Sequence, residues 1–517
     1  MSMYQTQNVK VISRWILFIL CILTLLELLI FPEFENLYGC ITFIIAWLLL
    51  SVFVMNQQNV NKCFIPFLAL FGLGCCFFFL PLLITLIEGK PLTFRFQTPY
   101  LTFNYQLLNL LMLILAYRLC LKIYKPSNIL SKLWFKLGYF TPPTDKQIWA
   151  MGIIGVCSQI SLLLIMGTDE ARAENLGFWG HLLWVTKNFA CFPILLLFKN
   201  LYSIGVKTKT NKQLIILYLI ILLALGLATG KRTAIFGSLV TIVMCYVVPI
   251  FTENKRIFSR RTLLIGFIGI YLITGPIANL AAAMALGRDN SGRTSSSETF
   301  QKIIDLYQDK ERLNAMYKTF LMTTDNAGDN SFGWSEYYVD NIMMDRFCNL
   351  RVCDMTIDYA NKLGFNNPTM HEYFTKQLLF VFPTPILNFI GINVNKFQYQ
   401  YTPGDLISME SLKIGHYHGY RVAGDVGIGL YLWGDMYFIY AFFIYFALFY
   451  FLSSIVCYKE YAYLIFPLPV LVDLFRYFLL FNNSTGIVGV FVTLLRTGWQ
   501  AIIVYCIILL IIKKVIK

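Results

Sequence analysis

The chain has 517 residues, of which 57% are hydrophobic and 14% are charged, and its formal net charge is +14. Its mean hydropathy of +0.63 lies far outside the range of soluble domains. The positive charge is spread over short segments between apolar runs, and no compact basic domain is present to hold a duplex. We therefore expect the lipid bilayer as partner and no nucleic acid.

Apolar runs such as 63–87 and 262–284 contain about the roughly 20 residues that cross the hydrocarbon of a bilayer. They lack the alternation of barrel strands, and backbone groups in hydrocarbon must bond to one another, so the runs are predicted to be helices. The sequence thus predicts an all-α polytopic integral membrane protein. We expect about twelve spans, at 15–31, 38–55, 63–87, 104–121, 147–166, 180–198, 213–229, 233–251, 262–284, 435–456, 461–481 and 486–512.

The first run is predicted to be an uncleaved span, because Lys10 and Arg14 precede it and no small-residue cleavage site follows. With the N-terminus inside, the short inner connections carry most of the Lys and Arg, whereas the short outer ones are acidic or mixed. This pattern places both termini in the cytoplasm. It divides the chain into a membrane domain of nine spans (1–284), a large outer loop (285–425) and a second membrane domain of three spans (426–517).

One short outer hairpin breaks this rule, because Lys231 and Arg232 stand there without an acid beside them. An anionic partner at the outer face would explain two cations on that side. The alternative is that both side chains reach lipid headgroups.

The large loop contains two predicted amphipathic helices and an apolar segment too short to cross the membrane comfortably. Helical spacing relates Phe300, Ile303, Ile304 and Tyr307, and then Leu313, Met316 and Phe320. The segment 377–393 is interrupted by Pro383 and Pro385, which favours a re-entrant or interfacial position. Six loop aromatics could line a sugar-binding groove or belong to a core: Trp334, Tyr337, Tyr338, Phe397, Tyr399 and Tyr401.

The densest group of reactive side chains lies where the loop returns to the membrane. His416 and His418 could act as general bases near neutral pH. Arg421 could hold a phosphate through two parallel hydrogen bonds, and Asp425 could orient a histidine or act as the base itself. The alternatives are a glycine-rich loop with a surface histidine pair, or a fortuitous metal site.

Arg288 and Arg293 stand at the other end of the same loop. Both loop ends should lie near the outer membrane surface, so these two cations could converge with Lys231, Arg232 and Arg421. Gathered guanidinium groups repel one another unless an anion such as pyrophosphate neutralises them. The alternative for each residue is a solvated or headgroup-bound charge.

Three ionisable residues interrupt the last apolar runs. Asp473 and Arg476 are three residues apart, on one face of a predicted helix, and could neutralise each other. Arg496 interrupts the final span, with a role that the sequence leaves open.

In the loop, Cys348 and Cys353 could form a disulfide if that compartment is oxidising.

The architecture resembles that of the Wzy-type oligosaccharide repeat-unit polymerases (O-antigen and capsule polymerases) of bacteria, which have about a dozen spans and a large late periplasmic loop. The hairpin 230–233 (Gly-Lys-Arg-Thr) is similar to the short Gly-x-Arg turn of that family. The stretch 424–434 is similar to its Glu-Leu-Tyr-Leu-Asn-Phe-Gly segment, although Gly429 replaces the acid and Trp433-Gly434 replaces Asn-Phe-Gly.

The resemblance implies a GT-C-like architecture in the bacterial inner membrane, with the loop in the periplasm. It further implies transfer of a glycan from undecaprenyl diphosphate onto a second undecaprenyl-diphosphate-linked oligosaccharide, without metal or cofactor. A chain-length-regulating co-polymerase is an implied partner. The diphosphate-binding candidates are Lys231, Arg232, Arg288, Arg293 and Arg421, and the catalytic candidates are His416, His418 and Asp425.

Three other functions remain open at this point. An O-antigen ligase uses the same lipid carrier but a different acceptor. A transporter or flippase of lipid-linked oligosaccharide would use the intramembrane charges and would tolerate loss of His416 and His418. A non-catalytic scaffold would tolerate replacement of single loop arginines.

Overall fold

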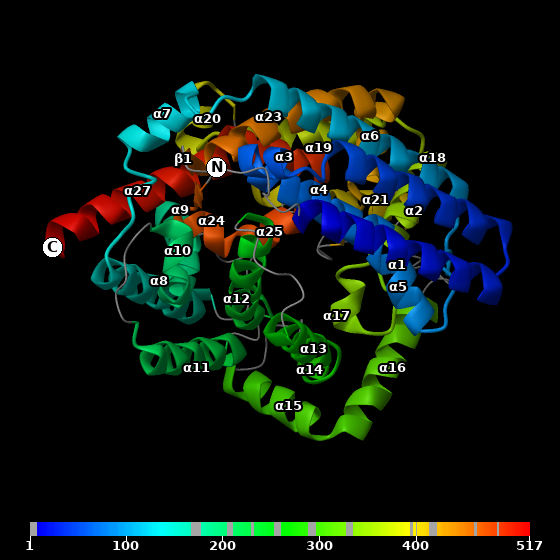
Figure 1. The fold of residues 1–517 in the computed structure, drawn as a ribbon, viewed down its shortest axis with the longest axis horizontal. Helices are drawn as coiled ribbons and strands as arrows, with labels where there is room; N and C mark the ends of the chain where they lie inside the picture. Colours follow the sequence, from blue (N-terminus) through cyan, green and yellow to red (C-terminus); the bar gives the residue numbers. More distant parts are fainter. Residues whose placement is uncertain are drawn as a thin grey trace.

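The computed structural model describes residues 8–166, 177–203, 210–228, 232–252, 260–287, 296–326, 334, 336–392, 396–399, 401–412, 421–459, 463–482 and 485–516. Almost all regular structure in these residues is helical (Figure 1). The first third contains α1 (Asn8–Ile30), α2 (Phe34–Phe53), α3 (Gln57–Lys62), α4 (Phe64–Phe78), α5 (Leu80–Ile87), α6 (Pro99–Ile123), α7 (Ile129–Lys136) and α8 (Asp145–Met166).

The middle third contains further apolar helices, followed by the large loop. Its elements are α9 (Gly177–Thr186), the 3₁₀ helix η2 (Lys187–Phe198), α10 (Lys199–Tyr202), α11 (Lys212–Ala228), α12 (Arg232–Thr252), α13 (Arg260–Thr274) and α14 (Pro276–Gly287). The large loop contains α15 (Ser296–Gln308), α16 (Lys310–Asn326), α17 (Ile342–Asp345), α18 (Leu350–Leu363), α19 (Pro368–Leu379), α20 (Thr384–Phe389), η3 (Lys396–Tyr399) and α21 (Pro403–Leu412).

The last part of the chain forms a second set of apolar helices and one small sheet. Its elements are α22 (Asp425–Trp433), η4 (Gly434–Met436), α23 (Tyr437–Ser454), β1 (Cys457–Lys459), β2 (Tyr463–Ile465), α24 (Leu468–Val472), α25 (Leu474–Phe478), η5 (Leu480–Asn482), α26 (Gly486–Val492), the π-helix η6 (Thr493–Thr497) and α27 (Gly498–Val515). The strands pair antiparallel, with Tyr458 opposite Leu464.

Eight helices among the described residues are long and apolar enough to cross a membrane: Asn8–Ile30, Phe34–Phe53, Phe64–Ile87, Pro99–Ile123, Asp145–Ile165, Trp179–Tyr202, Asp425–Ser454 and Gly486–Val515. All eight coincide with expected spans, which confirms the helical membrane class. Of the other four, 213–229 and 233–251 fall on α11 and α12, whereas 262–284 and 461–481 are each divided between shorter elements. The clearest case is 461–481, which holds two five-residue helices that meet at Asp473.

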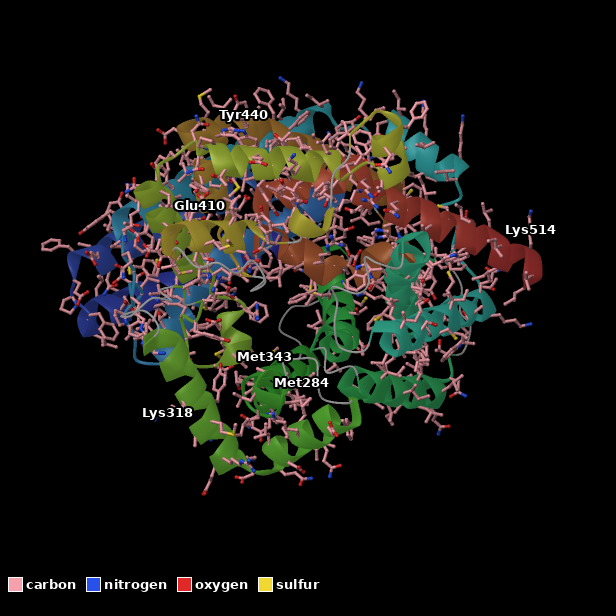
Figure 2. All side chains as sticks on the ribbon, turned by 180° about the vertical axis from the view of Figure 1, so that it is seen from behind. Met284, Lys318, Met343, Glu410, Tyr440 and Lys514 are labelled. Carbon is pink, nitrogen blue, oxygen red and sulfur yellow. The ribbon has the colours of Figure 1, made fainter. Side chains whose placement is uncertain are left out.

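The amphipathic helices expected in the large loop are present as α15 and α16. Ile303, Leu306 and Leu313 are buried against α14, whereas Tyr307 and Met316 remain at the surface. The two helices lie at the lower edge of the molecule in Figure 1. Seen from behind, Lys318 marks the outer side of α16, and Met284 and Met343 lie further inward (Figure 2).

Small residues and aromatic rings let the membrane helices approach closely. A Cβ on Gly72 would overlap the backbone carbonyl oxygen of Phe478, so α25 packs directly on the backbone of α4. Helix α23 packs along α6. Tyr105 stacks on Phe438, and the hydroxyl of Tyr124 donates to the carbonyl of Ser453. Small residues at such contacts are typical of helix packing in membranes.

Segments expected on one side of the membrane contact one another. At one end, Lys62 donates to the carbonyl of Leu121 and Trp134 donates to the hydroxyl of Ser454. At the same end, Leu201 accepts a bond from the backbone of Phe466. Lys62, Trp134 and Leu201 belong to connections expected to be cytoplasmic, and Leu121, Ser454 and Phe466 lie near the cytoplasmic ends of expected spans.

At the other end, carboxylates tie the outer connection 88–98 to the large loop. Asp354 of α18 accepts bonds from the backbone N–H groups of Gln97 (2.6 Å) and Thr98 (2.9 Å) at the start of α6. Glu88 accepts bonds from the backbone N–H groups of Asp340 (2.8 Å) and Asn341 (3.1 Å). The large loop is therefore docked on the bundle through charge-assisted bonds to backbone.

We predict that Gly72→Ala destabilises the protein by about 1–3 kcal/mol or more, because the new methyl group would overlap the backbone carbonyl of Phe478. Gly266→Ala is the matched control, since no atom lies within 4 Å of the position that its Cβ would take. Thermal unfolding of the purified protein in detergent, followed by size-exclusion chromatography, measures both. Equal midpoints for the two variants would contradict the close packing of α4 on α25.

Candidate functional site

The candidate site residues expected from the sequence are unequally represented in the described part of the chain. Lys231, Arg288, Arg293, His416 and His418 lie outside the described residues. Arg232 is the first residue of α12, and only its backbone is described. The positions of Arg421 and Asp425 are described in full, so the site is built from these two outward.

Arg421 is half-buried beside α21, where three polar side chains fix its position. Its guanidinium Nη1 donates to the hydroxyl oxygen of Ser408 at 2.7 Å. Its backbone N–H donates to Asp405 at 3.1 Å, and its carbonyl accepts a bond from the hydroxyl of Thr402 at 2.7 Å. The Asp405 carboxylate is occupied by backbone, so the Arg421 charge has no ion-pair partner among the described residues.

Glu336 lies next to Arg421, although no sequence pattern singled it out. Its Oε1 accepts a 2.6 Å bond from the backbone N–H of Val422 and a 3.4 Å bond from the indole of Trp334. Burial raises the pKa of the Glu336 carboxyl, although the Val422 amide and the charges of Arg346 and Arg421 act in the opposite direction. Glu336 is thus a carboxylate of raised pKa placed between two guanidinium groups.

Arg346 follows α17 and is exposed. Its side chain forms no ion pair within the described part of the chain, yet its charge acts on both Glu336 and Asp345. Asp345 cannot neutralise it fully, because its Oδ1 accepts a 2.9 Å bond from the backbone of Tyr338. Burial raises the pKa of the Asp345 carboxyl to about 7, which weakens its charge further.

The membrane domain approaches the same region at α25. The ring of Phe347, which follows Arg346, lies 6.1 Å from the ring of Phe475 of α25. Arg476, the next residue, is exposed, and this helix packs on α4. We call Arg346 and Arg421, together with Glu336, the arginine cluster.

The expected neutralisation of Asp473 by Arg476 is not an ion pair. Asp473 stands at the break between α24 and α25, so the single helical face expected from the sequence is interrupted there. No contact within ion-pair distance joins these two described side chains, and their interaction is only long-range. Arg476 is therefore an exposed cation on α25 without an ion pair to Asp473.

Asp425 is buried at the start of α22, and its surroundings are those of a packing network. Its Oδ2 accepts bonds from the hydroxyls of Tyr445 (2.6 Å) and Tyr437 (2.9 Å), and Tyr437 also lies 3.3 Å from Asn109 of α6. A Cβ on Gly486 would stand 2.9 Å from Oδ1. The catalytic role of Asp425 stays a prediction, whereas its link between α6, α22 and α23 is observed.

The loop aromatics divide into core and half-buried residues. Tyr338 is 1% exposed, and its hydroxyl donates to the carbonyl of Leu92, so it belongs to the core. Trp334 is buried and stacks on Tyr359. Tyr399 and Tyr401 are half-buried, with ring centroids 6.2 Å apart.

Cys348 and Cys353 are free thiols, and the expected disulfide between them is absent. Cys348 packs with Ile84 and Tyr338, whereas Cys353 belongs to the main core. Burial raises the pKa of both thiols. Both residues therefore serve as small apolar side chains.

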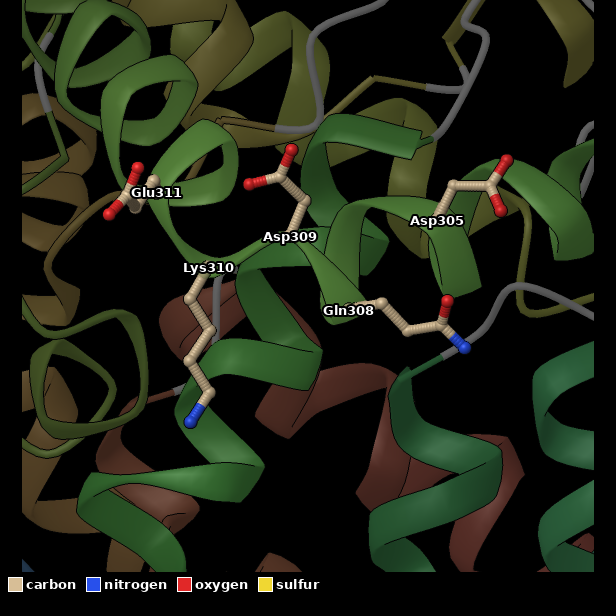
Figure 3. A pocket seen from close by; sticks show the side chains of 5 residues that line it. All are labelled: Asp305, Gln308, Asp309, Lys310 and Glu311. Carbon is tan, nitrogen blue, oxygen red and sulfur yellow. The ribbon is translucent and has the colours of Figure 1, made fainter.

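A shallow hollow of about 570 Å³ lies at the junction of α15 and α16, lined by Asp305, Gln308, Asp309, Lys310 and Glu311. Its side chains point in different directions and do not converge on one point (Figure 3). Asp309 caps α16 through the backbone N–H of Arg312 at 3.0 Å. This hollow therefore has the character of a solvated helix junction.

No family model, curated protein or solved structure matches the chain. Within the described ranges, no group of three or more His, Cys, Asp or Glu side chains could hold a metal ion. The chemistry of the site therefore has to be inferred from the arginine cluster itself.

We predict that inorganic pyrophosphate binds to the purified protein and that Arg346→Gln and Arg421→Gln each weaken this binding about tenfold, because a charge-assisted bond contributes roughly 1.5–3 kcal/mol. Glu336→Gln should strengthen the binding, since it removes the negative charge beside the anion while keeping an oxygen for the Val422 amide. Isothermal titration calorimetry measures these changes. Arg312→Gln, an exposed arginine on α16, is the control that should change nothing.

Proposed function

We propose that the protein transfers glycan from a polyprenyl-diphosphate carrier onto the sugar of a second lipid-linked repeat unit, as an oligosaccharide repeat-unit polymerase. The observation that supports this most directly is the arginine cluster, in which the charges of Arg346 and Arg421 act on one carboxylate of raised pKa, that of Glu336. Such a surplus of cations suits a diphosphate. Its position where the large loop meets α25 suits a substrate that is itself anchored in the bilayer.

The proposed reaction has one bond made and one bond broken. The acceptor hydroxyl oxygen attacks the anomeric carbon of the donor sugar, and the bond from that carbon to the diphosphate oxygen breaks. Negative charge develops on the departing diphosphate, where Arg421 and Arg346 stabilise it. Glu336 takes the hydroxyl proton, a role that fits its raised pKa. Lys231, Arg232, Arg288 and Arg293 are proposed as further cations of this site.

We assign the end of the bundle around Lys62, Trp134 and Ser454 to the cytoplasm of a bacterial inner membrane. Its connections carry most of the short-loop lysines and arginines, as the positive-inside rule requires. The docked large loop then faces the periplasm. The full set of twelve spans also belongs to this proposal.

A transporter of lipid-linked oligosaccharide is the second candidate, supported by a different feature. The segment 468–478 is a pair of five-residue helices broken at Asp473, inside the membrane domain. Broken helices with charged residues are typical of transporter substrate sites. This function would need Asp473 and would not need Glu336.

The decisive experiment gives the purified protein a defined undecaprenyl-diphosphate repeat unit and resolves the glycan on a gel. We expect a ladder spaced by one repeat unit, and we expect Arg421→Ala to lower its rate by about 10²–10³-fold, as loss of one charge-stabilising donor does. Arg312→Ala should leave the ladder unchanged. Transfer only after lipid A core is added would identify a ligase. Carrier movement across vesicles without any new glycosidic bond would favour transport.

The rate of polymerisation should rise as the pH increases past the raised pKa of the Glu336 carboxyl. A base must be deprotonated to accept the proton, so activity is lost as pH falls below that pKa and is present above it. Glu336→Gln should abolish this pH dependence and lower the rate, while pyrophosphate binding is retained. A pH profile of the initial rate tests this, and an unchanged profile in Glu336→Gln would assign the base elsewhere.

A further inference from the structure

Helix α20 and the turn before it expose apolar side chains although they belong to the polar loop. Phe382, Ile386, Phe389 and Ile390 are 50%, 49%, 90% and 57% exposed. We call these four residues the apolar tip. Arg496 of the last membrane-spanning helix donates a 3.1 Å bond to the carbonyl of Phe380, just before the tip. The tip therefore lies beside a membrane helix, where hydrocarbon can cover it.

A row of aromatic rings leads from the arginine cluster to this tip. Thr402, which bonds to the carbonyl of Arg421, follows Tyr401 in the chain. The ring of Tyr401 lies 6.2 Å from Tyr399, and Tyr399 lies 5.8 Å from Phe380. We call Tyr401, Tyr399 and Phe380 the aromatic row. All three residues are half-buried, and the ammonium groups of Lys376 and Lys396 lie 5.8 Å and 5.7 Å from the ring centroids of Tyr399 and Phe380.

The row is held in place by hydrogen bonds to its backbone carbonyl groups. Tyr373 donates to the carbonyl of Tyr401 at 2.8 Å, and Gln377 donates to the carbonyl of Tyr399 at 3.0 Å. Lys396 donates to the carbonyl of Phe382 at 2.8 Å. These bonds attach the row to α19, which in turn packs on α26 through Phe374 and Phe491, 5.2 Å apart.

One end of this surface holds Arg346 and Arg421, whereas the other end exposes the four apolar side chains of the tip. The two cations beside the tip, Lys396 and Arg496, both donate to backbone carbonyls. We propose that the aromatic row and the apolar tip bind the polyisoprenoid chain of a lipid-linked diphosphate whose head group lies at the arginine cluster. This inference rests on the proposed function and adds the path of the lipid. A glycan could stack on the aromatic row, but a polar glycan would not cover the tip, whereas an isoprenoid chain can cover both.

The order of arginine cluster, aromatic row and apolar tip also sets the orientation of the bound substrate. The diphosphate lies at Arg421, the chain leaves along Tyr401 and Tyr399, and it enters the hydrocarbon at Phe389. The glycan is then directed away from α20, towards the loop surface around Glu336. Such an arrangement keeps the reacting sugar in water and its carrier in lipid.

The test places a benzophenone amino acid at Phe389 or at Leu164 in the full-length protein, in nanodiscs that contain phosphatidylglycerol and radiolabelled undecaprenyl phosphate. Leu164 of α8 is 80% exposed and is the matched control. We expect about tenfold more label at position 389 than at 164, as a tenfold difference in occupancy requires. Unlabelled undecaprenyl phosphate should compete, and additional phosphatidylglycerol should not. Equal labelling at both positions would overturn the proposal.

A second variant separates the path of the chain from the binding of the head group. Phe389→Ser with Ile386→Ser should lower undecaprenyl phosphate binding about tenfold and should leave pyrophosphate binding unchanged, while Leu164→Ser changes neither. Loss of pyrophosphate binding in the tip variant would show a merely structural role and would also overturn the proposal. Specific labelling without glycan polymerisation would support the path of the lipid and refute the polymerase, so the two failures can be told apart.

Discussion

The part of this protein that contains the large loop depends on carboxylates that accept hydrogen bonds from backbone N–H groups. Asp354 binds the start of α6, Glu88 binds the turn before α17, and Asp405 binds the backbone of Arg421. Each bond joins segments far apart in the sequence or closes a turn of the loop. Because the Asp405 carboxylate is occupied by backbone, it does not form an ion pair with the Arg421 guanidinium. A bond that holds the loop in place therefore also leaves the charge of Arg421 available.

This positive charge is the basis of the chemistry proposed for the site. Arg346 and Arg421 act on one carboxylate, that of Glu336, whose own charge is weakened by burial. Guanidinium groups in such a place repel one another, and a bound diphosphate would offset that repulsion. The same field would favour departure of a diphosphate leaving group. Binding and catalysis would then use the same two arginine side chains.

The membrane around the site contributes a second constraint. Hydrocarbon excludes unpaired polar groups, so the proposed reaction would take place at the edge of the bundle while the carrier stays in the hydrocarbon. Short elements lie in this part of the protein: α24 and α25 are separated at Asp473, and α20 exposes Phe389 near the last membrane helix. The span expected at 461–481 falls on such short elements.

The sequence by itself determined the helical membrane class, the position of the eight long spans and the amphipathic helices α15 and α16, because length, hydropathy and helical period are local properties. It also singled out Arg421. Only the tertiary structure decided that Glu336 and Arg346 stand beside it, that Arg476 is not paired with Asp473, and that Cys348 and Cys353 are free. Those facts depend on contacts between residues distant in the chain, and a polar loop residue has no local pattern that shows which neighbour it will meet.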